Sequence, residues 1–204
     1  MSCPSRSPEF LMEAFWISTG VVAIAEIGDK TQLLAIVLAA KFRRPLPIIL
    51  GILAATLLNH AAAAYLGQLI ASWLDGATLR VLVGLAFLAM AGWALVPDGQ
   101  QDGSIVRSHG GVFCATLVAF FIVEIGDKTQ IATSLLAAKF DSVGIVTLGT
   151  TAGMMLANVP AVYLAEAATK LVPLHYVRMI AALIFAAIGA SVLVMSMMGE
   201  TATP

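Results

Sequence analysis

Two copies of one seven-residue segment carry the side chains best suited to chemistry in this chain. The sequence EIGDKTQ occupies residues 26–32 and recurs at residues 124–130. Each copy places a Glu and an Asp three positions apart, which puts both carboxylates on one face of a helix. Carboxylate oxygens suit hard divalent cations such as Ca²⁺, Mn²⁺ and Mg²⁺, whereas zinc and copper favour the Cys and His that the segments lack. The two segments therefore predict a metal site with four carboxylate ligands: Glu26, Asp29, Glu124 and Asp127.

The charges of the two segments indicate an exchange of a cation for protons. Four carboxylates and two lysines, Lys30 and Lys128, leave a formal charge of −2, which one divalent cation neutralises. Without the cation, excess negative charge in a low dielectric favours protonation of the carboxylates. Each lysine stands four positions after a glutamate, and we expect these Glu–Lys pairs to hold the empty site together. The hypothesis is antiport of a divalent cation against protons.

Further residues near the segments have several roles open to them. A set of polar residues could act as accessory ligands, support the ligands, or form hydrogen bonds between helices. They are Lys30, Thr31, Gln32, Lys128, Thr129, Gln130 and Asn158. A shift of 98 positions aligns Asn158 with His60, for which we favour a hydrogen bond between helices. Gly28 and Gly126 either let two helices approach closely or let the helix open and expose carbonyl oxygens. Pro160 removes a helical hydrogen bond and is a candidate hinge or a packed kink.

The composition shows what kind of protein carries these segments. Of 204 residues, 60% are hydrophobic and only 11% are charged, a balance typical of membrane proteins. The net charge of −1 excludes a basic nucleic-acid-binding surface. Two cysteines, Cys3 and Cys114, and three scattered histidines provide neither a disulfide framework nor a zinc motif. We therefore expect no resident cofactor, only the transported divalent cation as a bound ion.

Six apolar runs are long enough to cross a bilayer, so we predict an all-α polytopic membrane protein with six transmembrane helices. Their ranges are 15–40, 45–74, 79–96, 113–138, 143–168 and 177–198. We interpret residues 1–11 as a disordered tail or a non-native remnant, with Met12 as the natural start. Residues 12–97 then form one repeat, 98–111 a linker loop, 112–198 a second repeat and 199–204 a tail.

An internal repeat organises these helices. Beyond the seven identical residues, the sequence LAAKF at residues 38–42 recurs at residues 136–140. Because each repeat has three helices, the second must enter the membrane from the opposite side, which makes an inverted repeat of the kind common in transporters. Lys and Arg are more frequent on the side of the central loop, which places that loop in the cytoplasm and the termini in the periplasm.

Six charged residues lie near the middle of the first and fourth predicted helices, where each costs about 2.5–3.5 kcal/mol unless it faces protein or water. Two hypotheses of other classes explain them differently. One is a membrane-embedded aspartyl-type enzyme that uses Asp29 and Asp127, although two adjacent lysines oppose a shared proton. The other is a non-transporting assembly subunit held together by buried ion pairs. Transport of the cation fits four acids and two lysines better, so we predict a transporter and not an enzyme.

Two copies of Glu-x-Gly-Asp-Lys-Thr, at residues 26–31 and 124–129, resemble a family of small Ca²⁺/Mn²⁺ transporters. Its eukaryotic members are Golgi Ca²⁺/Mn²⁺:H⁺ exchangers and its bacterial members are manganese exporters. The resemblance implies that the acidic residues of both motifs bind the cation. The short central loop resembles the bacterial members, which implies the bacterial inner membrane. The sequence leaves open Mn²⁺ against Ca²⁺, H⁺ against Na⁺ as the coupling ion, and whether the protein is an oligomer.

Overall fold

The computed structural model describes residues 7–96, 111–164 and 174–200, and every regular element in these ranges is a helix. In chain order the helices are α1 (Pro8–Glu26), α2 (Lys30–Phe42), α3 (Pro45–Ser72), α4 (Gly76–Ala94), α5 (Gly111–Glu124), α6 (Lys128–Phe140), α7 (Val143–Leu164) and α9 (Leu174–Glu200).

Several of these helices have the length and apolar composition to cross a membrane. Among the described residues, α1, α3, α4 and α7 qualify, while α5 and residues Ala182–Met198 of α9 are shorter apolar helices. Large apolar side chains cover the outer surface, and Leu183 and Met195 are 64% and 70% exposed. Apolar surface of this extent indicates contact with lipid. The protein is therefore a helical membrane protein.

The first and fourth predicted helices are not continuous, contrary to our expectation. Residues 15–40 are divided between α1 and α2, and residues 113–138 between α5 and α6. Both interruptions fall inside the EIGDKTQ segments, so the acidic residues lie at helix ends instead of helix centres. This placement changes which charged side chains can meet.

The outer boundaries also differ in places from those we expected. Helix α1 begins at Pro8, within the expected tail, because Ser7 caps it: the backbone N–H of Phe10 donates to Ser7 Oγ at 3.4 Å. Helix α9 extends to Glu200, which also enters an expected tail. Residues 98–110 of the expected linker and 165–168 of the fifth predicted helix lie outside the described residues.

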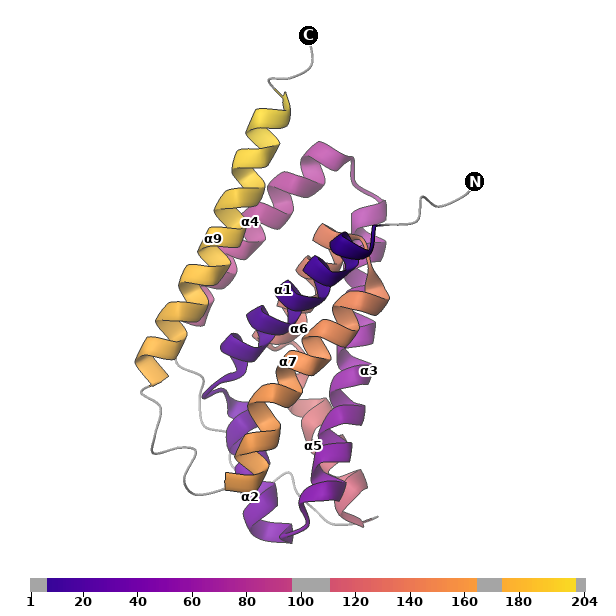
Figure 1. Ribbon diagram of the computed structural model, residues 1–204, viewed down its shortest axis with the longest axis vertical. Coiled ribbons are helices and arrows are strands. Elements are labelled where there is room, and N and C mark those ends of the chain that lie inside the picture. The colour runs from indigo at the N-terminus through magenta and orange to yellow at the C-terminus, as the bar shows by residue number, and fades with distance from the viewer. Residues whose placement is uncertain (1–6, 97–110, 165–173, 201–204) are drawn as a thin grey trace.

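The helices of the two halves run in opposite directions (Figure 1). Helices α1 and α2 descend in this view and α3 ascends, whereas α5 and α6 ascend and α7 descends. Helix α1 packs against α7, and α3 packs against both α5 and α6, so each half supports the other's broken helix. Helices α4 and α9 form an antiparallel pair beside this bundle, where Gly84 and Gly189 let the two backbones approach.

Two apolar cores flank the helix breaks. One core joins α1, α3, α4, α6, α7 and α9 around Phe87, Phe140 and Phe185. The other joins α2, α3 and α5 around Leu38, Ile52 and Phe120, with Val162 of α7. Since α1 and α6 belong to one core and α2 and α5 to the other, the breaks lie where the cores meet.

Candidate cation-binding site

A glycine in each motif produces the helix break. Gly28 has a φ of 78° and Gly126 has a φ of 74°, a left-handed conformation that residues with a side chain rarely adopt. A Cβ built at Gly126 meets no atom within 4 Å, so close packing is not the reason for glycine there. Of the two roles we considered for these glycines, local opening of the helix is therefore the one seen at Gly126.

The glutamine of each motif braces the break. The backbone N–H of Gly28 donates to Gln32 Oε1 at 2.8 Å, and that of Gly126 donates to Gln130 Oε1 at 2.7 Å. Gln32 Nε2 also donates to the carbonyl of Ala157 at 3.1 Å, which ties the first break to α7. These bonds use the amide oxygen of each glutamine. In this structure, therefore, Gln32 and Gln130 support the two helix breaks.

Three carboxylates converge between the two breaks. Glu26, Asp29 and Asp127, which we call the acid cluster, each have a carboxylate oxygen within 4.8 Å of the others, and all three residues are buried. Asp29 and Asp127 stand at the N-caps of α2 and α6, where the helix dipole favours negative charge. Residues from both halves of the chain thus build a single anionic centre.

The fourth predicted ligand, Glu124, lies beside this cluster and outside the group of three. It accepts hydrogen bonds from Thr56 Oγ1 at 3.1 Å and Asn59 Nδ2 at 3.3 Å, both on α3. The Asn59 amide also donates to the carbonyl of Phe121 at 3.1 Å. The sequence analysis assigned no role to Thr56. A sign of one was its spacing of three positions from Asn59 in an otherwise apolar helix.

The lysines pair with the aspartates of the opposite half. Lys30 Nζ lies 2.9 Å from Asp127 Oδ1, and Lys128 Nζ lies 3.8 Å from Asp29 Oδ1. The expected pairing of each lysine with the glutamate four positions earlier is wrong. That spacing brings side chains together only along an unbroken helix, and the chain leaves the helix between Glu26 and Lys30.

Buried polar atoms without a hydrogen bond surround the acid cluster. Within the described residues, neither carboxylate oxygen of Glu26 has a hydrogen-bond partner, nor do Thr31 Oγ1, Asn158 Oδ1 and both ring nitrogens of His60. Asn158 lies near Glu26, but its amide donates to Met154, to the carbonyl at 3.1 Å and to Sδ at 3.0 Å. Each such atom costs about 1–3 kcal/mol unless water or an ion satisfies it.

Two further candidates, Thr129 and Pro160, remain to be placed in the structure. Thr129 Oγ1 donates to Asp127 Oδ2 at 3.1 Å and so orients that carboxylate. Pro160 is exposed, and α7 continues through it to Leu164.

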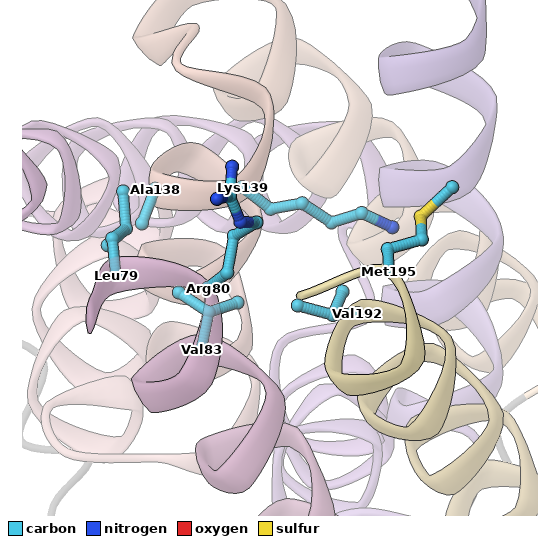
Figure 2. Close-up of a pocket in the computed structure, with 7 residues that line it drawn as sticks. All are labelled: Leu79, Arg80, Val83, Ala138, Lys139, Val192 and Met195. Atoms are coloured by element: carbon cyan, nitrogen blue, oxygen red, sulfur yellow. The ribbon is translucent and has the colours of Figure 1, made fainter. Parts of the chain in front are cut away.

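A separate cavity of about 180 Å³ lies between α4, α6 and α9 (Figure 2). Its lining is mainly apolar, and its charged residues, Arg80 and Lys139, are cationic. A cation is repelled from such a cavity, so the acid cluster is the candidate site for a metal ion.

These features define a class of protein. Broken helices that meet at buried charges inside a helical membrane protein are typical of secondary transporters. The family described as "Divalent cation/proton antiporter GDT1" matches residues 14–102 and 112–200, one segment in each half. The chain therefore belongs to this family of divalent cation/proton antiporters, and the resemblance noted from the two motifs is confirmed.

Relatives of known name agree with this assignment. A Vibrio cholerae protein named "Putative manganese exporter" is 48% identical over 184 residues, which are 90% of each chain. GDT1-like protein 3 of rice (Oryza sativa subsp. indica) is 27% identical over 66% of this chain and 57% of its own. A GDT1-like protein of Synechocystis is 25% identical over 66% of this chain and 75% of its own. No solved structure matches the chain.

The family settles the class of activity. The protein is a transporter of divalent cations and protons, so the enzyme hypothesis and the assembly-subunit hypothesis are both wrong. Its apolar helices and its family make it an integral membrane protein.

Proposed function

We propose that this protein exports Mn²⁺ across the bacterial inner membrane in exchange for protons, using the acid cluster and Glu124. The observation that carries the proposal is the convergence of Glu26, Asp29 and Asp127, from both halves, within 4.8 Å of one another. The choice of Mn²⁺ is supported by the name of the Vibrio cholerae relative, which is nearly half identical. The protein holds no resident cofactor in this proposal, and Mn²⁺ is its substrate.

The three clustered carboxylates bind Mn²⁺ directly in this proposal, because hard cations take carboxylate oxygens. Glu124 supplies a fourth ligand when its carboxylate turns toward the cluster. Carbonyls in the last turn of α1 that lose their helical partners at the break can add oxygen ligands, as unwound segments do in other transporters, although the Glu26 carbonyl already accepts from the Asp29 N–H at 3.1 Å. When Mn²⁺ leaves, Lys30 and Lys128 neutralise the aspartates, and protons neutralise the glutamates.

We further propose that the two halves are inverted repeats that form six membrane spans and change access by moving against each other. The opposite directions of corresponding helices support this arrangement (Figure 1), as does the family's match to each half separately. The distribution of Lys and Arg supports a cytoplasmic central loop and periplasmic termini.

Flux measurements in proteoliposomes with a pH gradient test the proposal. We expect uptake of Mn²⁺ to depend on the gradient and to exceed that of Ca²⁺ and Mg²⁺. Asp29→Asn and Asp127→Asn should fold but lose transport. Asp75→Asn, at the exposed N-cap of α4, should fold and keep transport. Normal Mn²⁺ flux in either of the first two variants contradicts the proposed site. Flux that ignores the pH gradient contradicts the proton coupling.

A further inference from the structure

The two halves of the chain differ in polarity on either side of the acid cluster. Helices α6 and α7 carry hydroxyl side chains at five positions where α2 and α3, shifted by 98 residues, carry apolar ones. Thr133, Ser134, Thr147, Thr150 and Thr151 take the places of Ala35, Ile36, Ile49, Ile52 and Leu53. The opposite difference occurs at Thr56 and Asn59 of α3, which match Met154 and Ala157, but those two side chains donate to Glu124. The hydroxyls of the second half need a separate explanation.

Two of these hydroxyls lie on the face of α7 that leads to the acid cluster. Thr147, Thr151 and Asn158 are spaced by four and seven residues, which places them on one face of the helix. All three are buried, and Asn158 lies near the carboxylate of Glu26. The file of side chains spans about 16 Å at 1.5 Å per residue. It therefore connects the beginning of α7 to the candidate site.

The hydroxyls of Thr147 and Thr151 lack the hydrogen bond that threonines in helices usually make. A threonine in a helix can donate to the carbonyl four residues earlier, as Thr150 does to Val146 at 2.9 Å and Thr133 does to Thr129 at 2.7 Å. Among the described residues, Thr147 Oγ1 and Thr151 Oγ1 have no hydrogen-bond partner at all. A buried hydroxyl without a partner is costly unless water or an ion satisfies it.

On the opposite approach to the cluster, the positions that match Thr147 and Thr151 carry Ile49 and Leu53, and the hydroxyl of Thr116 on α5 already donates to the Val112 carbonyl at 2.8 Å. There Ile48 and Ile52 of α3 pack with Leu38 of α2 and Phe120 of α5 in a continuous apolar core. An ion that leaves water needs oxygen atoms to replace part of its hydration shell. Hydroxyl groups supply them, and isoleucine side chains do not. Met154 is fully buried between Thr151 and Asn158 in the sequence, and its Sδ accepts a hydrogen bond from Asn158 Nδ2 at 3.0 Å.

We propose that Thr147 and Thr151 line the path by which the hydrated cation passes between the acid cluster and the membrane face where α1 begins (Figure 1). We call these two residues the hydroxyl path. The inference rests on the proposed transport function and adds a route to it. It assigns the hydroxyl groups to the moving ion and water, and not to the packing of helices.

Cysteine accessibility tests the path without requiring transport. In a background with Cys3 and Cys114 replaced by serine, Thr151→Cys is compared with Ile52→Cys, a buried position on the apolar approach. The probe is trimethylammonium-ethyl methanethiosulfonate, a cationic thiol reagent that does not cross membranes. Because a thiol in dry apolar surroundings is inert, we expect labelling at Thr151→Cys to be at least about tenfold faster. Mn²⁺ should slow it. Equal labelling rates overturn the proposal.

A second comparison separates a path from a packing role. Thr147→Val and Thr151→Val keep the side-chain shape and remove the hydroxyl, while Thr147→Ser and Thr151→Ser keep the hydroxyl. We expect the valine variants to slow Mn²⁺ flux about tenfold, the cost of one lost oxygen contact. Their Mn²⁺ affinity in detergent should stay unchanged, and the serine variants should transport normally. Thr150→Val is the control, because that hydroxyl already bonds to α7.

Valine variants that transport Mn²⁺ at the normal rate overturn the path. So do valine variants in which Mn²⁺ flux and Mn²⁺ affinity fall by the same factor, because the loss then lies in binding and not in passage. Failure of the proposed function is a different result. In that case the unsubstituted protein moves no Mn²⁺ in the pH gradient, whatever the labelling at Thr151→Cys shows.

Discussion

Lys30 Nζ lies 2.9 Å from Asp127 Oδ1, an ion pair that joins the first motif to the second. The reciprocal pair, from Lys128 to Asp29, is longer at 3.8 Å. In both pairs the lysine and the aspartate come from different halves of the chain. A divalent cation that enters the acid cluster must therefore compete with ammonium groups for the same two aspartates. Release of the lysines on cation binding would loosen the contact between the halves.

Substitution of Lys30 should destabilise the protein and make its stability depend on the cation. Lys30→Met leaves Asp127 buried near two other carboxylates, and removal of one partner of a buried pair costs about 3–5 kcal/mol. We expect a lower Tm in detergent, with Mn²⁺ raising the Tm more than in the unsubstituted protein. Adding Asp127→Asn should recover part of the Tm but not transport. An unchanged Tm in Lys30→Met contradicts the importance of the pair.

Glu26→Gln should lose transport without losing stability. Both oxygens of Glu26 are buried without a hydrogen bond from a described residue, and a proton neutralises this carboxylate in our proposal when the cation is absent. A neutral amide of the same shape should therefore change the free energy of unfolding by no more than about 1 kcal/mol. Glu13→Gln, on the exposed part of the same helix, should change neither property. The measurements are Tm in detergent and Mn²⁺ flux, and a strongly destabilised Glu26→Gln protein contradicts this interpretation.

The hydrogen bonds from α3 to Glu124 should tune cation affinity. Asn59→Ala removes the donor at 3.3 Å from the carboxylate and also the bond to Phe121. Loss of a partner that orients a metal ligand lowers affinity about 10-fold to 100-fold, measurable as Mn²⁺ binding by calorimetry. Gln68→Ala is the control on the same helix, because its bonds to Asp141 are exposed. Equal affinities in the two variants would contradict the role of Asn59 in orienting Glu124.

Gly126→Ala should strain the second helix break. Its φ of 74° costs a residue with a Cβ about 1–2 kcal/mol, and no steric clash adds to this cost. Gly126→Asn should be milder, since asparagine adopts the left-handed region more readily. Gly20→Ala, within α1 and equally free of clashes, should be neutral or slightly stabilising. The ranking of the three Tm values checks the argument, and a Tm for Gly126→Ala at or above that of Gly20→Ala refutes it.

The sequence by itself determined the class of the protein and the residues that matter. Apolar composition and the cost of buried charge singled out the EIGDKTQ segments, because charges at such positions must have a purpose in a membrane. The identity of the two segments over seven residues then indicated two related halves. The motifs also carried the family resemblance, which the match to residues 14–102 and 112–200 confirms. The six spans and the set of metal ligands stay predictions.

Only the tertiary structure decided which of these residues meet. Apolar periodicity shows that a segment is helical but not that Gly28 turns left-handed, so the expected pairing of Lys30 with Glu26 failed. The true partner, Asp127, is distant in sequence and comes close only when the two breaks face each other. For the same reason the sequence did not predict that Glu26 and Glu124 have different hydrogen-bond partners. Their motifs are identical, but α3 offers Thr56 and Asn59 to Glu124, while the matching positions on α7 are Met154 and Ala157.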